Sequence, residues 1–510
     1  MSPAEAEALY QRAFAAYRQG EPALAQRALG ELLARRPTEA RALLLLGVVA
    51  DKKTEPAVAL ALVEQAASLD PTDAGAWYNL GVFEGERNNL ERALDCYRRA
   101  VAIDPTYLDA LGNGCELLRR LEHFETALEW ADRRLALGTD EWTSHLNRGV
   151  CFFHLGRWKE AEASMDRARE LGPDRPIILW ERFPLMLFQK RFAEAWDAFE
   201  RRFEVGHLNG VFAYPFDAAP LWGGEPLAGK HIVIHNEQGL GDQLMFACAL
   251  GEVIAQARRT TLVAAPPLVD LFKASFPAAE VLPARYGRFA GDHPEPPWMK
   301  DLPPYDYQAP IGSLMAALRR APESFDLPTA YLRPSQAARA RWADFDAGPG
   351  LKVGICWASN PALFRRDSAR RAVRKSMELD TLAPLAELDG VSLVSVLNWK
   401  IDPLPAAFRG RLLDVSDRLA SLDETAALIE RLDVVVTVDT AVAHLAGALG
   451  KHTIVLLHEF PDCRWELTAD ASYWYPNMPL LRQTTRGDWG PVVEAARAAL
   501  AARAQAKVAA

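Results

Sequence analysis

The sequence lacks several features that would assign a chain of this size to a specialised class. Its six cysteines are scattered without a Cys-x-x-Cys pair, which argues against a disulfide framework or a cysteine zinc site. No apolar run reaches membrane-spanning length, and the acidic N-terminus has no signal-peptide pattern. The formal net charge of −9 provides no basic surplus for nucleic acid. We therefore expect reduced thiols, a cytoplasmic location, no membrane insertion and no nucleic-acid partner.

Common catalytic motifs are also missing. The sequence contains no H-E-x-x-H, P-loop or G-x-S-x-G pattern, and its other histidines lack metal-ligand spacing. Gly239-Leu-Gly241-Asp242 resembles the start of a dinucleotide fingerprint, but Leu244 stands where the last glycine should be. We therefore expect no metal, no cofactor, no covalent nucleophile and no dehydrogenase.

What the first two-fifths of the chain do have is a 34-residue period. Three residue types recur at this spacing: Pro37, Pro71, Pro105 and Pro173, with Thr139 interrupting; Gly47, Gly81 and Gly149; and Ala25, Ala59, Ala93, Ala127, Ala161 and Ala195. This period is the signature of tetratricopeptide repeats, in which small residues mark helix crossings and proline ends the second helix. About six units fit between Ala6 and Arg202, so we predict a helical solenoid over residues 1–207.

Such an array curls into a superhelix with a concave inner face. We expect that face to be a groove for a protein or peptide partner. The alternative is a scaffold for self-association or spacing, and the repeat positions cannot name the partner because they encode packing.

After the repeats, the composition changes twice. Residues 208–230 are rich in proline, glycine and aromatics and predict an ordered connector. Two α/β domains then follow, over residues 231–345 and 346–510. Short apolar runs predict their strands at 231–235, 260–265, 351–357, 391–397, 433–438 and 453–457. The residues from 281 to 310 are expected to form loops, and Ser421 with Glu424 predicts a capping box.

The most informative segment begins where the fifth of these strands ends. Asp439 and Thr440 are cap-type residues placed where a helix should begin, and Gly450 stands where it should stop. The N-terminus of a helix offers free N–H groups and a positive dipole end to a phosphate. His444 lies four residues after Thr440, so both side chains face one side of the helix. The alternative is an ordinary βαβ unit with a polar cap.

A second polar turn follows the first predicted strand. His235 ends that strand, and Glu237, Gly239, Gly241 and Asp242 follow it. The glycines let the backbone approach a ligand closely. Asp242 is either a group that acts on a ligand in the cleft or the N-cap of the next helix.

Basic residues crowd the sequence after the strand that ends at Trp357-Ala-Ser-Asn360. They are Arg365, Arg366, Arg370, Arg371, Arg374 and Lys375. One or two of them are expected to neutralise a diphosphate, while the rest form a solvated loop. Arg464 and Trp465 would offer a cation and a stacking ring to a nucleotide base, or would pack at the rim.

These segments, taken in order, resemble bacterial tetratricopeptide-repeat glycosyltransferases of the heptosyltransferase-like group. The similarity rests on the stretch from Gly229 to Asp242, on Trp357–Asn360, on Arg374–Leu379, on Asp439–His444 and on Tyr473–Pro476. The Asp-Thr-x-x-x-His segment matches that family's donor-phosphate motif, with Ala441 where glycine is common.

The resemblance implies an α + α/β chain whose transferase part has the GT-B fold, with two Rossmann-like halves around a cleft. It implies metal-independent transfer from a nucleotide sugar, with 231–345 on the acceptor side and 346–510 on the donor side. Asp242 is the expected base, with Glu237 and His235 as alternatives. The expected donor site comprises Gly239, Gly241, Trp357, Asn360, Lys375, Asp439, Thr440, His444 and Arg464.

Three hypotheses on function follow. The first is an inverting transferase acting on a protein hydroxyl, with flagellin as a candidate because some relatives with this layout modify it. The second is transfer to a lipopolysaccharide-type or other glycan. The third is a repeat scaffold whose transferase part has lost activity.

Overall fold

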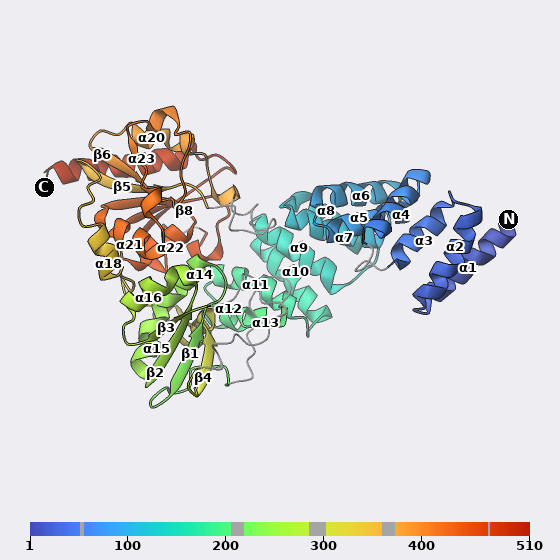
Figure 1. Cartoon of the computed structure of the whole chain (residues 1–510), viewed down its shortest axis with the longest axis horizontal. Coiled ribbons are helices and arrows are strands. Elements are labelled where there is room, and N and C mark those ends of the chain that lie inside the picture. Colours follow the sequence, from blue (N-terminus) through green and yellow to red (C-terminus); the bar gives the residue numbers. More distant parts are fainter. Residues whose placement is uncertain (51–55, 206–218, 285–301, 360–372, 468–469, 510) are drawn as a thin grey trace. The chain divides into compact units, whose positions relative to one another are not determined.

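The computed structural model describes residues 1–510 except 51–55, 206–218, 285–301, 360–372, 468–469 and 510 (Figure 1). The described residues form two compact units, Met1–Ile178 and Leu179–Ala510. The first unit is helical and the second contains both sheets.

The helices of the first unit pack in successive antiparallel pairs, as a tetratricopeptide array requires. They are α1 (Pro3–Arg18), α2 (Pro22–Arg35), α3 (Ala40–Val49), α4 (Pro56–Leu69), α5 (Ala74–Glu86), α6 (Leu90–Ile103), α7 (Leu108–Arg120), α8 (Phe124–Ala136), α9 (Trp142–His154) and α10 (Trp158–Leu171). The predicted solenoid is therefore confirmed for these pairs.

Steric fit explains the glycine and alanine grids. A Cβ atom on Gly81 would lie 2.7 Å from the Tyr97 ring and 3.2 Å from the carbonyl oxygen of Ala93. A Cβ atom on Gly149 would lie 2.6 Å from Met165 and 3.2 Å from the Ala161 oxygen. In these two units the helices therefore cross where only a glycine leaves enough room.

Three further helices follow the grid into the second unit: α11 (Pro176–Phe188), α12 (Phe192–Phe199) and α13 (Arg202–Val205). The 34-residue period places these three helices in the predicted solenoid of residues 1–207. In the structure, Phe192, Trp196 and Phe199 belong to the same buried core as the two sheets. The Trp196 indole N–H also donates to the Arg319 carbonyl oxygen, at 2.7 Å. The compact unit therefore begins at Leu179, because the aromatic face of the last repeat packs against the α/β core.

The first lobe of the second unit has a four-stranded parallel sheet in the order β3-β2-β1-β4. Its strands are β1 (His231–His235), β2 (Arg259–Ala264), β3 (Glu280–Pro283) and β4 (Tyr307–Pro310). Its helices are α14 (Leu240–Phe246), α15 (Leu250–Gln256), α16 (Val269–Ser275) and α17 (Leu314–Leu318). Because β3 and β4 lie within 281–310 or at its edge, the expectation of loops throughout that stretch was wrong.

The described part of the predicted connector lies along β4. Leu221 forms a parallel bridge with Gln308, whose side-chain amide donates to the Ala219 carbonyl oxygen at 2.7 Å. Trp222 and Leu227 are buried. Residues 219–230 are therefore ordered against the edge of the sheet.

The second lobe has seven strands in the order β10-β11-β9-β8-β5-β6-β7. The strands are β5 (Leu351–Cys356), β6 (Val391–Ser395), β7 (Leu412–Leu413), β8 (Val434–Val438), β9 (Thr453–Leu457), β10 (Ala471–Ser472) and β11 (Tyr475–Arg482). The helices are α18 (Gln336–Arg341), α20 (Ala383–Ala386), α21 (Leu422–Arg431), α22 (Ala441–Ala448) and α23 (Gly490–Ala509). All pairings are parallel except β10 with β11.

The two lobes meet through α14 and α22, which lie next to each other (Figure 1). A Cβ atom on Gly241 of α14 would lie 3.0 Å from the His444 ring of α22. The helices that follow β1 and β8 therefore approach closely, and the polar turns before them face one region of the molecule.

One predicted cap differs in detail. Ser421 accepts from the Glu424 backbone N–H at 3.2 Å, as the capping box requires. The Glu424 carboxylate instead accepts from the Trp342 indole N–H, at 2.6 Å. A tertiary hydrogen bond thus replaces the reciprocal half of the box.

Candidate functional site

Asp242 lies in the first turn of α14, beyond the loop that leaves β1. Gly239 is the N-cap residue, and its backbone N–H donates to Asp242 Oδ2 at 2.9 Å. Asp242 Oδ1 accepts from the Arg464 guanidinium of the second lobe. The alternative role of Asp242, the N-cap of this helix, is therefore wrong, because Gly239 occupies that position. Asp242 is the third helical residue, which accepts from the N-cap backbone and forms an ion pair across the two lobes.

The surroundings of Asp242 favour the protonated form more than water does. Burial raises the pKa of Asp242, and the charge of Arg464 offsets only part of that increase. A carboxylate with a raised pKa binds a proton more readily, as a general base must.

The second carboxylate of the region follows β8. Asp439 is buried, and its Oδ2 atom pairs with Lys375 Nζ. Burial alone would raise the pKa of Asp439, but Lys375 more than offsets burial and holds that pKa below its usual range. Asp439 is therefore a permanent anion that positions Lys375.

Thr440 is the N-cap of α22, as predicted. Its Oγ1 atom accepts from the Val442 backbone N–H at 3.2 Å and lies 3.2 Å from Thr437 Oγ1. The helix continues to Ala448, and Gly450 follows with a φ of +69°, which suits glycine. The cap leaves the first N–H groups of α22 beside Asp439 and Lys375.

His444 is enclosed between the two lobes. Its Nδ1 atom lies 3.1 Å from the Tyr475 hydroxyl, and its ring stacks on Trp465 at a centroid distance of 5.0 Å. Burial, with Arg464 nearby, lowers the pKa of His444 to about 3. The imidazole is therefore neutral at pH 7, so the positive charge near α22 comes from Lys375 and Arg464.

Asp462 completes the cluster, although sequence reasoning missed it. It follows β9, and its Oδ2 atom lies 3.3 Å from Arg464 Nη1. Burial opposes ionisation of Asp462, but Arg464 holds its pKa well below the usual range. Its position in the sequence could have indicated it, because Asp462 follows a buried strand, as the other site residues do.

The two alternative bases have structural partners. Glu237 is buried, and its oxygens accept from Arg202 and from the Gly312 backbone N–H, each at 2.8 Å. His235 is also buried, with Nε2 at 3.2 Å from Gln308 Oε1. Burial lowers the pKa of His235 to about 4.

Trp357 directly follows β5 and is 6% exposed, and its carbonyl oxygen accepts from the Met377 N–H at 2.9 Å. That hydrogen bond joins the end of β5 to the residues just after Lys375. Asn360, Arg365, Arg366, Arg370 and Arg371 lie outside the described residues.

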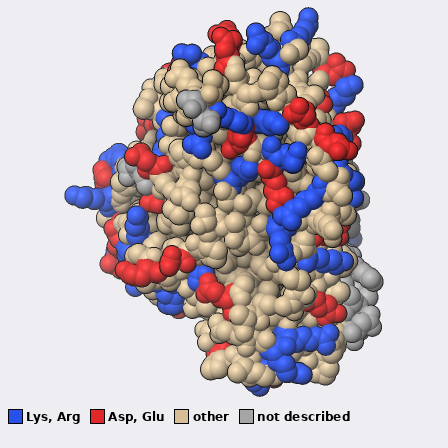
Figure 2. All heavy atoms as spheres, turned by 90° about the vertical axis from the view of Figure 1, so that its left-hand side faces the viewer, with Lys and Arg blue, Asp and Glu red and all other residues tan. Residues whose placement is uncertain are grey.

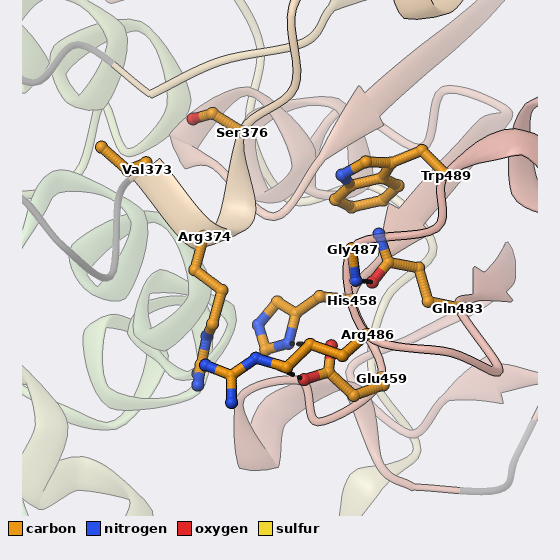
Figure 3. Close-up of a pocket in the computed structure, with 9 residues that line it drawn as sticks. All are labelled: Val373, Arg374, Ser376, His458, Glu459, Gln483, Arg486, Gly487 and Trp489. Carbon is orange, nitrogen blue, oxygen red and sulfur yellow. Dashed lines mark hydrogen bonds and ion pairs between the residues drawn. The ribbon is translucent and has the colours of Figure 1, made fainter. Parts of the chain in front are cut away.

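A pocket of about 230 Å³ lies beside Lys375, near the ends of β9 and β11. Figure 3 shows Arg374, His458 and Arg486 pointing into it, with the Trp489 ring on the opposite side. Glu459 lies 3.6 Å from Arg486 Nε and 3.8 Å from His458 Nδ1. Of these residues, the sequence prediction included only Arg374.

Charges of both signs are interspersed over the face shown in Figure 2, with a broad uncharged area between them. Among the residues that the structure describes, there is no group of three His, Cys, Asp or Glu side chains that could hold a metal ion. Within the same ranges, no helix combines the length and the apolar character that crossing a bilayer requires.

Known families match both parts of the chain. Residues 10–53, 74–107 and 116–176 match the tetratricopeptide repeat, and residues 414–471 match glycosyltransferase family 9 (heptosyltransferase). The chain therefore carries tetratricopeptide repeats and a segment that matches glycosyltransferase family 9. The family 9 match contains Asp439, Thr440, His444 and Arg464.

One curated protein similar to this chain is Protein FlbA of Caulobacter vibrioides, which is 30% identical over 380 residues. The match covers 71% of this chain and 62% of FlbA, so the chain spans less than two thirds of that relative.

Among solved structures, similar chains include MamA, PilF of Pseudomonas aeruginosa and YrrB, a TPR protein described as having an unusual peptide-binding site. Their identities are 21%, 19% and 18%, and their TM-scores are 0.30, 0.35 and 0.32. The matches cover 33%, 40% and 35% of this chain and 92% of each of the other chains.

Proposed function

We propose that this protein transfers a sugar from a nucleotide-activated donor to a hydroxyl group of a protein held by the repeats. Flagellin is the candidate acceptor, on the strength of the family resemblance. One observation carries the proposal. The Asp242 carboxylate of the first lobe meets Arg464 of the second lobe, beside Lys375 and the start of α22 in the family 9 domain.

In the proposed reaction, Asp242 removes the proton from the acceptor hydroxyl as its oxygen attacks the anomeric carbon. The bond to the donor phosphate breaks on the opposite side of that carbon, so the configuration inverts. Lys375, Arg464 and the N–H groups at the start of α22 stabilise the charge of the departing phosphate. No step requires a metal ion in this scheme.

The carboxylate partners of both cations bear on donor binding. Lys375 is paired with Asp439, and Arg464 with Asp242 and Asp462. A diphosphate must therefore share these cations with carboxylates. When it draws Arg464 away from Asp242, the pKa of Asp242 rises further, which makes it a stronger base once the donor has bound.

Calorimetric titration with UDP, GDP, ADP, CDP and dTDP tests the donor class, and transfer is then assayed with the matching nucleotide sugars. We expect one nucleotide to bind and its sugar to be transferred. Asp242→Asn should lower turnover by about 10²–10⁴-fold, since it removes a general base, yet retain nucleotide binding.

Two outcomes would count against the proposal. Turnover of Asp242→Asn within about threefold of wild type would exclude Asp242 as the base. No binding of any nucleotide would favour a repeat scaffold without transferase activity.

A further inference from the structure

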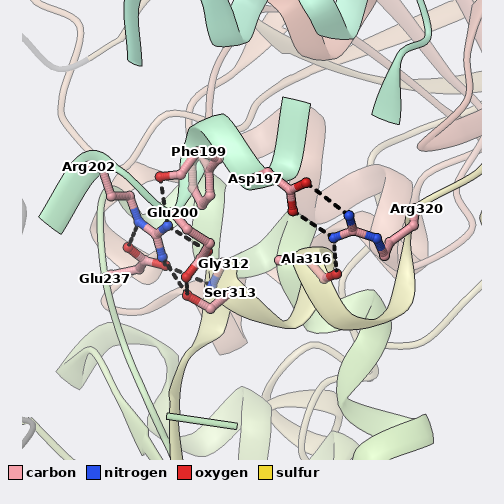
Figure 4. A network of polar contacts seen from close by, with 9 residues as sticks. All are labelled: Asp197, Phe199, Glu200, Arg202, Glu237, Gly312, Ser313, Ala316 and Arg320. Atoms are coloured by element: carbon pink, nitrogen blue, oxygen red, sulfur yellow. Dashed lines mark hydrogen bonds and ion pairs between the residues drawn. The ribbon is translucent and has the colours of Figure 1, made fainter. Parts of the chain in front are cut away.

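A buried ion-pair network joins α13 to the loop that precedes Asp242 (Figure 4). Arg202 has no exposed surface, and all three of its nitrogen atoms donate. The acceptors are both oxygens of Glu237, the Ser313 hydroxyl, the Phe199 carbonyl oxygen and the Glu200 carboxylate, at 2.7–3.0 Å. These bonds use the full donor capacity of a guanidinium.

Glu237 is equally well held. Its Oε1 atom accepts from Arg202 Nη2 and from the Gly312 backbone N–H, and its Oε2 atom accepts from Arg202 Nε. A Cβ atom on Gly312 would lie 2.4 Å from Glu237 Oε1, so only glycine fits there. We refer to Arg202, Glu237, Glu200, Gly312 and Ser313 as the Arg202 clamp.

Stability alone does not account for such a network. Removing two charges from water is costly, and a well-packed apolar pair is often at least as stable as a buried ion pair. What a bidentate Arg–carboxylate pair provides is a defined geometry for the groups it joins. The clamp therefore fixes Glu237 relative to α12, α13 and the turn that follows β4.

Glu237 lies in the loop between β1 and α14, five residues before Asp242. The next residue, Gln238, has a φ of +57°, which a side-chain-bearing residue adopts only when its neighbours hold it there. The clamp holds the loop on one side of Gln238. On the other side, the Gly239 N–H donates to the Asp242 carboxylate.

We propose that Arg202 and Glu237 are positioning residues, which fix the loop before α14 and the first turn of that helix, residues 237–242, and thereby the carboxylate of Asp242. This inference rests on the proposed function, because it assumes that Asp242 is the base. It extends that function in one respect. The helices that end the repeat grid help to set the geometry of the reaction centre.

A second ion pair at the same interface provides a matched control. Both oxygens of Asp197 accept from Arg320, at 2.9 and 3.0 Å, so this pair also joins the last repeat to the first lobe (Figure 4). Asp197 is 63% exposed and Arg320 is 45% exposed, and Arg320 donates to Asp197 and to the Ala316 carbonyl oxygen. Asp197→Asn therefore breaks a similar link without touching the clamp.

The test is hydrogen–deuterium exchange of the full chain, followed in peptides that cover residues 236–246. Glu237→Gln keeps the shape of the side chain and leaves Arg202 paired with Glu200. We expect exchange in these peptides to accelerate at least tenfold in Glu237→Gln and Arg202→Lys, and less than twofold in Asp197→Asn. Peptides from α23 report whether each variant has retained its fold.

Activity gives a second readout, which a merely structural role would not produce. In Glu237→Gln, kcat should fall at least tenfold while KM for the donor stays within threefold, because the proposed phosphate contacts, Lys375, Arg464 and the start of α22, lie in the second lobe. If that variant does not fold, Ser313→Ala, which removes only one hydroxyl from the clamp, should accelerate exchange in the same peptides about threefold.

The proposal would be overturned if residues 236–246 exchanged at the wild-type rate in folded Glu237→Gln and Arg202→Lys. Where those variants do not fold, a wild-type rate in Ser313→Ala would overturn it. Equal acceleration in Asp197→Asn would also overturn it. The exchange experiment needs no donor. Absence of transfer by the wild type would thus refute the proposed function while leaving the clamp to be judged by exchange.

Discussion

Three buried histidines of the second unit are neutral in the folded chain. Burial lowers the pKa of His235 to about 4, and of His444 and His458 to about 3. In the unfolded chain each would titrate near 6.5. Below pH 6.5 the unfolded chain binds protons at these histidines, whereas the folded chain does not. The stability that depends on the neutral histidines is therefore complete above pH 6.5 and is lost as the pH falls toward 4.

This linkage gives a prediction at the residue scale. Between pH 6 and pH 4.5, unfolding of the second unit should take up about three protons, a loss of ~4 kcal/mol of stability per pH unit. The free energy of unfolding in urea is measured at several pH values, with hydrogen exchange in β1 and α22 as the probe. Its slope against pH gives the number of protons taken up. His444→Gln should remove about one proton from it. A slope of one proton or less in the wild type would contradict the prediction.

At the scale of an element, two of the three glycines of α5 have opposite expectations. A Cβ atom on Gly81 would meet the Tyr97 ring at 2.7 Å, whereas on Gly85 the nearest atom lies 4.0 Å away. Gly81→Ala should therefore destabilise the first unit by about 1–3 kcal/mol through overpacking. Gly85→Ala should stabilise it by about 0.5–1 kcal/mol, since alanine is the better helix former. Thermal unfolding monitored by circular dichroism measures both stability changes. Equal effects of the two variants would contradict the steric explanation.

The same repeats show how far the sequence predicts the fold. Residue-type grids reveal the helix crossings because only small side chains fit there. The turns inside the units also keep the 34-residue period, with positive φ at Gly20, Asn88, Glu122, Gly156 and Lys190. These five positions hold four residue types, so the sequence does not display this conformational grid. The backbone geometry is enforced by the packed helices on either side.

The candidate site divides in a similar way. The cap at Thr440 and the turn before Asp242 are local features, and the order of residue types predicts them. The ion pair between Asp242 and Arg464 joins residues 222 positions apart, and the bond from Arg202 to Glu237 bridges 35. No spacing rule indicates such partners, because they depend on how α13, α14 and the strand ends are packed. The short strands β3 and β4 escaped prediction for a related reason: their burial comes from neighbours distant in the sequence.

At the scale of the whole molecule, the boundary between the two units determines how the repeats can be removed. Phe192, Trp196 and Phe199 are buried in the core of the second unit, and Arg202 neutralises the buried Glu237. A chain starting at Phe212 would lose all four residues. Each buried aromatic side chain contributes about 1.5–3 kcal/mol, and an orphaned buried charge costs about 3–5 kcal/mol. Together these losses are comparable with the whole stability of a domain.

We therefore expect a chain starting at Pro176 to fold and one starting at Phe212 to unfold or aggregate. Thermal melting and size-exclusion chromatography compare the two chains. The chain from Pro176 should bind the donor nucleotide within twofold of the full protein, because the donor residues all lie in the second unit. It should lose most transfer to a protein acceptor if the repeats dock that acceptor, and should keep transfer to a small glycan if they do not. A monomeric chain from Phe212 that melts at the same temperature as the chain from Pro176 would show that α11–α13 do not complete the core.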